Sequence, residues 1–126
     1  AKPDTIATAI RIGNPASWDL AQEAKRDSGG AFGSVSDKEI LWMHRFLSQE
    51  TGVFVEPSSA TGAAGLHKLR QLGELPKVNS IVITVTGHGL KDPDWALKDQ
   101  NGRKIKPKKV AAAASSVAEI LGLERK

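Results

Sequence analysis

The sequence predicts an α/β protein with a three-layer architecture, in which helices cover both faces of a mostly parallel sheet. Strand-like and helix-like segments alternate along the chain. Two strand–helix–strand units follow each other at residues 31–55 and 53–85, each near the roughly 30 residues that such a unit takes. Residues 80–85, Ser-Ile-Val-Ile-Thr-Val, form a nearly continuous β-branched run. Such a run is typical of a strand buried on both faces of a parallel sheet.

The amino-terminal segments predict a strand and then a helix. Residues 8–12 are expected to form a short strand that ends at Gly13. Asn14 and Pro15 follow as a helix start, because asparagine caps free amides and proline is tolerated in the first turn. This helix should stop at Ser28-Gly29-Gly30, since glycine is the usual residue beyond a helix carboxyl end.

A second strand is expected at residues 31–35, and a helix follows it. Ser36 and Glu39 form a capping box, in which each side chain satisfies the backbone amide of the other. Apolar residues at helical spacing predict the buried stripe of this helix. They are Ile40, Met43 and Leu47.

A third strand is expected at residues 53–55, before a Glu-Pro-Ser-Ser turn into the next helix. Glu56 should favour the helix start through the helix dipole, and Ser58 and Ser59 should cap it. The apolar face of this helix is predicted at Leu66, Leu69 and Leu72. The last element is an alanine-rich amphipathic helix from residue 107 to about residue 123.

The composition is that of an ordinary globular protein, with 40% hydrophobic and 25% charged residues among 126. No apolar run approaches the roughly 20 residues of a membrane-spanning helix, so no membrane partner is expected. The absence of cysteine excludes disulfides and thiolate metal sites. His44 and His67 lack the spacing of metal ligands and are expected at the surface, so no metal site is predicted. A cytoplasmic location is the default expectation.

The net charge of +4 is a mild basic excess spread along the chain, and its densest basic segment lies near the carboxyl end at residues 103–109. A nucleic-acid site would require an organised basic stripe, with aromatic residues where single strands bind. No aromatic residue is interleaved with this segment. A solvated loop leading into a helix is therefore favoured, and no nucleic-acid partner is expected. A stand-alone domain that binds nucleic acid or phosphorylated ligands through this segment is the distant alternative.

Ser36, Glu56 and Thr86 each follow the carboxyl end of an expected strand. If both crossovers are right-handed, these residues meet at one edge of the sheet, where open α/β sheets bind ligands. Residues 86–93 read Thr-Gly-His-Gly-Leu-Lys-Asp-Pro, and the two glycines allow a sharp turn or a close approach. Their spacing fits neither a P-loop nor a dinucleotide fingerprint. From the residues alone, a tight strand exit with His88 on the surface is favoured.

Three segments nevertheless resemble the threonine synthase family. Residues 85–93, VTGHGLKDP, look like the TGHGLKDP signature near the end of those enzymes. Residues 8–15, TAIRIGNP, resemble a second segment of that family, and residues 56–60, EPSSA, resemble a third that related dehydratases share in looser form. Their order and spacing also match, and the similarity extends from about Pro3 to Leu97.

The resemblance implies the carboxyl-terminal part of a fold-type II pyridoxal-phosphate enzyme. Such an enzyme would convert O-phosphohomoserine and water to threonine and phosphate. Residues 1–97 would belong to its catalytic fold, and residues 98–126 would form a basic loop and a carboxyl-terminal helix, whose role the resemblance does not give. A threonine or serine dehydratase of the same fold is the alternative, although dehydratases usually show a Ser-Gly-Gly-Asn-like turn at the place of Thr86.

The resemblance also implies which residues bind the cofactor. Thr86 occupies the position of a hydroxyl that faces the pyridine nitrogen of pyridoxal phosphate, and Gly87 lies next to it. Ala9 and Ile10 occupy the place where the chain passes near the ring, and simple strand packing explains them equally well. A hydroxyl can donate to a neutral ring nitrogen, whereas a carboxylate would favour the protonated ring. Thr86 would thus moderate the electron-sink strength of the cofactor.

No catalytic residue is assigned within this chain. The family's Schiff-base lysine and its phosphate loop are expected upstream, and Lys91 does not match that lysine. The chain alone is therefore predicted to be inactive, and the remainder of the same enzyme is its expected partner. A homodimer is one candidate assembly. The roles of His88, Arg11 and Glu56 stay open: Arg11 either meets an anionic group or is an exposed strand residue.

Overall fold

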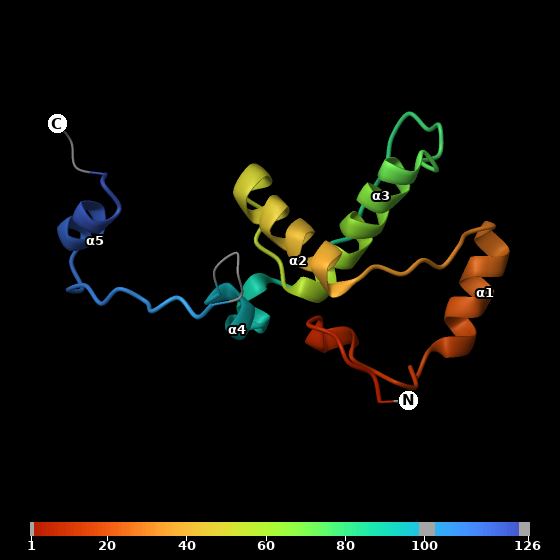
Figure 1. Cartoon of the computed structure of the whole chain (residues 1–126), viewed down its shortest axis with the longest axis horizontal. Coiled ribbons are helices and arrows are strands. Elements are labelled where there is room, and N and C mark those ends of the chain that lie inside the picture. Colours follow the sequence, from red (N-terminus) through yellow and green to blue (C-terminus); the bar gives the residue numbers. More distant parts are fainter. Residues whose placement is uncertain (1, 99–102, 124–126) are drawn as a thin grey trace. The chain divides into compact units, whose positions relative to one another are not determined.

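The computed structural model describes residues 2–98 and 103–123. The chain divides into two compact units, Ala1–Ala96 and Leu97–Lys126. The helices of the first unit are α1 (Trp18–Ser28), α2 (Asp37–Phe46), α3 (Thr61–Leu72) and α4 (Pro93–Ala96) (Figure 1). Its short turns are η1 (Thr8–Ile10), η2 (Leu47–Thr51), η3 (Pro57–Ala60) and η4 (Gly89–Lys91). The second unit contains α5 (Ala114–Ile120).

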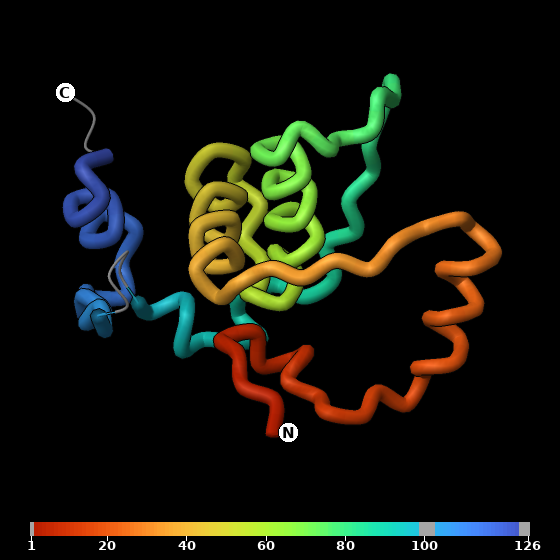
Figure 2. The backbone as a smooth tube through the Cα atoms, turned by 45° about the vertical axis from the view of Figure 1, so that its right-hand side comes forward, coloured from red at the N-terminus to blue at the C-terminus, as the bar shows by residue number. Residues whose placement is uncertain are grey.

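Helices α2 and α3 lie side by side and contact each other at the centre of the first unit (Figure 2). Helix α2 begins with the predicted capping box, which is confirmed. The Ser36 hydroxyl accepts from the backbone N–H of Glu39 at 3.3 Å, and the Glu39 carboxylate accepts from the backbone N–H of Ser36 at 2.6 Å. This backbone hydrogen bond lowers the pKa of Glu39, because it stabilises the ionised form.

Replacing Ser36 with alanine should lower the free energy of unfolding of the chain by about 1 kcal/mol. The substitution removes the acceptor for the Glu39 amide and leaves the start of α2 uncapped. Ser17→Ala is the matched control, because Ser17 precedes α1 without a side-chain cap hydrogen bond. Urea denaturation of both variants measures the difference. Equal losses in the two variants would contradict a capping role for Ser36.

The core of the first unit is small and is built around the predicted stripe of α2. Ile40 and Met43 are buried as predicted, and Leu47 packs partly against them. Three alanines belong to the same buried cluster as this stripe. They are Ala60 of η3 and Ala63 and Ala64 of α3. Because alanine is small, α3 approaches α2 closely on this face.

The predicted leucine face of α3 does not pack into the core of the first unit. Leu69 is 37% exposed and Leu72 is 60% exposed. Helix α3 turns its alanine face toward α2 instead, so the leucines lie on the side away from the core. There they line a cavity between two extended segments. A 3.6-residue period marks an apolar face of α3 but does not say which of two apolar faces meets the core.

Four strands are predicted from the sequence, at residues 8–12, 31–35, 53–55 and 80–85. Within the described residues no segment forms a strand, so the predicted sheet is not seen. Residues 8–12 contain η1 instead of a strand. Residues 53–55 form only an isolated antiparallel bridge, between Val55 and His88. The fourth is predicted to be buried on both faces, yet Val82 is 92% exposed. Strands form only where neighbouring strands satisfy their N–H and C=O groups, and no described segment forms a β-bridge with this one.

The predicted boundaries of the outer helices also need correction. Helix α1 begins at Trp18 rather than at Asn14 and Pro15, and it ends as predicted at Gly29, whose φ of 65° suits glycine. Helix α5 begins only at Ala114, so the predicted start at residue 107 is wrong. A start at residue 107 would place Lys108 and Lys109 in the first turn, where the helix dipole disfavours positive charge. None of the helices that the structure describes is long and apolar enough to cross a membrane.

Candidate functional site

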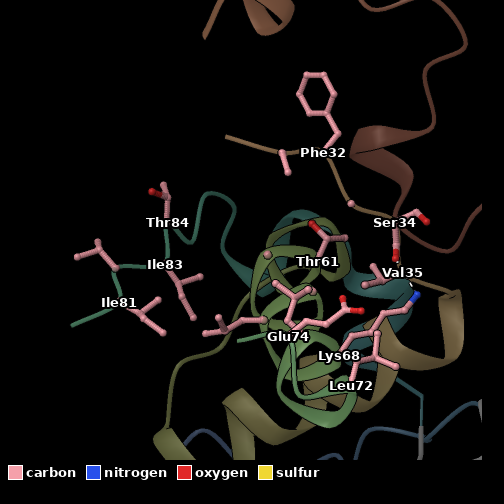
Figure 3. Close-up of a pocket in the computed structure, with 17 residues that line it drawn as sticks. Phe32, Ser34, Val35, Thr61, Lys68, Leu72, Glu74, Ile81, Ile83 and Thr84 are labelled. Carbon is pink, nitrogen blue, oxygen red and sulfur yellow. Dashed lines mark hydrogen bonds between the residues drawn. The ribbon is translucent and has the colours of Figure 1, made fainter. Parts of the chain in front are cut away.

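A cavity of about 800 Å³ lies on the outer face of α3. Figure 3 shows residues 31–35 and residues 81–84 on opposite sides of this helix. The Lys68 ammonium, on α3, donates to the Ser34 carbonyl at 2.9 Å and ties the first segment to the helix. None of the predicted cofactor-binding residues lines this cavity. Two of them, Thr86 and Gly87, lie in the turn that follows residues 81–84.

Residues 86–89 form that turn and pair with residues 54–56. The backbone N–H of Glu56 donates to the Gly87 carbonyl at 3.0 Å, and the N–H of Gly89 donates to the Phe54 carbonyl at 3.2 Å. These bonds flank the isolated antiparallel bridge between Val55 and His88. The turn is therefore held to the segment that leads into η3. Two of the three segments that resemble the family, residues 85–93 and 56–60, thus meet at this place.

Gly87 and Gly89 are needed because other side chains lie close to their backbone, and neither has a positive φ. A Cβ atom built on Gly87 would overlap the side chain of Glu56, which is only 8% exposed. A Cβ atom built on Gly89 would overlap the ring of Phe54. Of the two alternatives that the sequence allows, a sharp turn or a close approach, the structure shows the second.

Ser59 connects η3 to this turn. Its hydroxyl accepts from the backbone N–H of Gly87 at 2.5 Å and from that of Thr86 at 3.1 Å, and it lies 2.8 Å from the Thr86 hydroxyl. The predicted capping role is wrong for both serines, because neither η3 nor α3 has a side-chain cap. The hydroxyl of Ser58 is buried without a hydrogen-bond partner in the described part of the chain.

Sequence reasoning missed Ser59 as a functional candidate. Ser58 and Ser59 are adjacent and chemically identical, so the sequence offers no signal that separates them. The structure separates them because the turn η3 aims one hydroxyl at residues 86–87 and leaves the other without a partner.

The turn η1 carries Ala9 and Ile10, which the family resemblance assigns to the surroundings of the cofactor ring. Ile10 is 51% exposed, and η1 contacts η3. The Thr8 hydroxyl donates to the Asp92 carboxylate at 2.8 Å, and Asp92 is only 8% exposed. The segments around residues 8–10 and 86–92 are thus brought together, by this hydrogen bond and by their common contacts with η3.

His44 is buried, which corrects the expectation of a surface residue. Its Nδ1 has no hydrogen-bond partner among the described residues. Burial lowers the pKa of His44, because the charged imidazolium loses hydration, while a hydrogen bond with the Val55 backbone opposes this decrease. His67 is half-buried and stacks on Trp42, with ring centroids 4.5 Å apart. Both histidines serve packing in this structure.

The buried His44 should make the chain less stable in mild acid. Its pKa is lower in the folded state, so the unfolded state binds more protons as the pH falls below the usual histidine value of about 6.5. The free energy of unfolding should therefore decrease from pH 7.5 to pH 5.5. Urea denaturation at both values measures the decrease, which should become smaller in His44→Gln. An equal decrease in His44→Gln would contradict this origin.

His88 and Arg11, whose roles the sequence leaves open, make local contacts. The Nδ1 atom of His88 accepts from the Leu90 backbone N–H at 3.2 Å and so caps η4. The guanidinium of Arg11 donates to the Thr5 carbonyl, with its Nε at 2.9 Å. Within the described residues, no group of three or more His, Asp or Glu side chains is placed to hold a metal ion.

The chemistry of the turn fits an uncharged hydrogen-bonding partner such as a pyridine nitrogen. Thr86 is an exposed residue with a hydroxyl, and Gly87 beside it is buried and leaves no room for a side chain. A hydroxyl can donate to an unprotonated nitrogen without adding charge. The residues present at this turn are therefore compatible with the pyridoxal-phosphate ring that the resemblance implies.

Comparisons with known proteins agree with this chemistry. The family model described as pyridoxal-phosphate dependent enzyme matches residues 1–87. The threonine synthase of Mycobacterium leprae (strain TN) is 50% identical over 121 residues, which are 96% of this chain and 32% of that protein. The threonine synthase of Synechocystis sp. is 51% identical over 82% of this chain and 26% of its own length.

A third relative gives a similar result. The threonine synthase of Methanocaldococcus jannaschii is 49% identical over 96 residues, which are 76% of this chain and 24% of that protein. The chain thus spans about a quarter to a third of the length of the curated relatives it matches. Because the family model covers well over half of the chain, this chain belongs to the pyridoxal-phosphate-dependent enzyme family.

Proposed function

We propose that this chain is part of a threonine synthase, which converts O-phosphohomoserine and water to threonine and phosphate. The identity of about 50% with proteins named threonine synthase, over up to 96% of the chain, carries this proposal. The turn at residues 86–89 supports it, because a hydroxyl stands at the position that the family resemblance assigns to the cofactor ring. A threonine or serine dehydratase is the competing activity.

Within this enzyme, Thr86 would donate a hydrogen bond to the ring nitrogen of pyridoxal phosphate. Gly87 would let the ring approach the backbone, while Ala9 and Ile10 on η1 would line the site from the neighbouring turn. Bound pyridoxal phosphate supplies an electron sink for the reaction at the substrate carbons. A neutral hydroxyl at Thr86 would leave the ring nitrogen unprotonated and so moderate that sink. The catalytic lysine belongs to the remainder of the enzyme.

The three-layer sheet is also part of this proposal. Residues 31–35 and 81–84 are extended and flank α3, whose leucines remain open on that side. Strands from the remainder of the enzyme would pair with these segments and cover the leucines. Residues 1–97 would then belong to the catalytic fold, with residues 98–126 forming a basic loop and a carboxyl-terminal helix. A homodimer and a cytoplasmic location stay predictions.

The full-length enzyme that contains this segment tests the proposed activity. Incubation with O-phosphohomoserine and pyridoxal phosphate should release threonine and inorganic phosphate in equal amounts. The 126-residue chain alone should release neither above the rate without protein. Formation of ammonia and a 2-oxo acid from threonine or serine, without phosphate release from O-phosphohomoserine, would instead assign a dehydratase.

A further inference from the structure

The hydroxyl of Ser59 is the centre of a four-contact network at the candidate site. It accepts hydrogen bonds from the backbone N–H groups of Thr86 and Gly87, at 3.1 and 2.5 Å. It also lies 2.8 Å from the Thr86 hydroxyl and 3.2 Å from the Gly87 carbonyl. Ser59 is 3% exposed, so water does not compete for these contacts.

The direction of these hydrogen bonds follows from counting donors and acceptors. A serine hydroxyl has one hydrogen and two lone pairs. Backbone N–H groups can only donate, so those of Thr86 and Gly87 occupy both lone pairs of Ser59. The Thr86 hydroxyl therefore has no lone pair on Ser59 to which it could donate.

The single hydrogen of Ser59 has two acceptors within reach, and the Thr86 hydroxyl is the better one. That oxygen is 2.8 Å away, whereas the Gly87 carbonyl is 3.2 Å away and already accepts the N–H of Glu56 at 3.0 Å. Ser59 thus donates to Thr86. The hydrogen of Thr86 then points away from Ser59 and is available to an acceptor outside the network.

We propose that Ser59 is a positioning residue that fixes the Thr86 hydroxyl as a hydrogen-bond donor toward the ring nitrogen of pyridoxal phosphate. This rests on the cofactor role proposed above for Thr86. Ser59 touches neither the cofactor nor the substrate in this proposal and acts through Thr86. Without it, the Thr86 hydroxyl could rotate and direct its hydrogen elsewhere.

The chain supplies a matched control for this proposal in Ser58. The two serines lie in the same short turn η3 and are 8% and 3% exposed. The Ser58 hydroxyl has no hydrogen-bond partner in the part of the chain that the structure describes. Ser58→Ala therefore removes the same atom from the same turn without removing a contact to residues 86–87.

The test uses the full-length enzyme loaded with pyridoxal phosphate labelled with ¹⁵N in the ring. We expect Ser59→Ala to weaken cofactor binding about tenfold, the equivalent of one hydrogen bond. It should also move the ring ¹⁵N resonance to the position found in Thr86→Val. The double variant should match Thr86→Val alone, because Ser59 acts through Thr86. Ser58→Ala should keep the wild-type cofactor affinity and ring ¹⁵N resonance.

A second measurement tests the network without the cofactor. Amide hydrogen exchange at Thr86 and Gly87 should become faster in Ser59→Ala, because both N–H groups lose their acceptor. Exchange at these amides should not change in Ser58→Ala. If Ser59→Ala does not fold, Ser59→Cys replaces it, since a thiol is a weak donor and acceptor in the same place.

The outcomes separate this inference from the proposed function. If the wild type binds the cofactor and Thr86→Val moves the ¹⁵N resonance, an unchanged resonance in Ser59→Ala overturns the role of Ser59 alone. The role of Ser59 is also overturned if the double variant binds the cofactor more weakly than Thr86→Val alone. It is overturned as well if amide exchange at Thr86 and Gly87 is unchanged in Ser59→Ala. If Thr86→Val leaves the resonance unchanged, the cofactor role of Thr86 is wrong, and the role of Ser59 is overturned with it.

Discussion

Replacing Gly87 with alanine should lower the free energy of unfolding by about 1–3 kcal/mol, the usual range for overpacking a buried site. A Cβ atom at this position would overlap the Glu56 side chain from its γ-carbon to its carboxylate. Glu56 is 8% exposed, so its side chain cannot move aside without disturbing its surroundings. The added methyl should therefore push residues 86–87 away from residues 54–56, and with them the Thr86 hydroxyl from Ser59.

Gly65→Ala is the matched control for this substitution. Gly65 lies within α3, and a Cβ atom there would meet no atom within 4 Å. Alanine is the better helix former, so this variant should gain up to about 1 kcal/mol. Urea denaturation of the two variants should thus give changes of opposite sign. A loss below about 0.5 kcal/mol in Gly87→Ala would show that the Glu56 contact adjusts freely, which would contradict the close approach.

Replacing Asp92 with alanine should lower the free energy of unfolding by about 1.5–3 kcal/mol, the range for hydrogen bonds to charged groups. Its carboxylate accepts from the Thr8 hydroxyl at 2.8 Å and joins residues separated by 84 positions in the sequence. The side chain is nearly buried, so solvent cannot replace this contact fully in the folded state. The substitution should release η1 from the turn at residues 89–92.

Asp94→Ala is the control, because Asp94 is exposed and lies only two residues away. It should change the free energy of unfolding by less than about 0.5 kcal/mol, as surface substitutions usually do. A double-mutant cycle with Thr8→Val separates the shared hydrogen bond from other effects of each substitution. A coupling energy near zero would contradict the hydrogen bond between Thr8 and Asp92.

Local patterns predicted those elements that depend on local contacts. The capping box at Ser36 and Glu39 lies where the sequence places it, because both partners are three residues apart on one turn. Gly29, Gly52 and Gly73 end their helical segments with positive φ angles, which suits a residue without Cβ. These features need no distant segment and so can be read from the sequence.

The strands and the partners of helix faces could not be predicted in the same way. The β-branched run at residues 80–85 indicates a strand, but pairing requires neighbours that the run itself does not specify. Likewise, α3 has an alanine face and a leucine face, and only packing against α2 decides which one is buried. His44 appears polar in sequence, yet its neighbours Ile40 and Met43 lie in the same buried layer.

The sequence by itself determined the family resemblance and pointed to the turn at Thr86 and Gly87, because the three motifs are contiguous runs of residues. The tertiary structure decided how these motifs meet. It selects Ser59 over the identical neighbour Ser58, pairs Thr8 with Asp92, and places Glu56 against Gly87. Such choices depend on distances of a few ångströms between segments far apart in the chain. A residue pattern encodes which groups are present, whereas the fold decides which of them come within hydrogen-bonding reach.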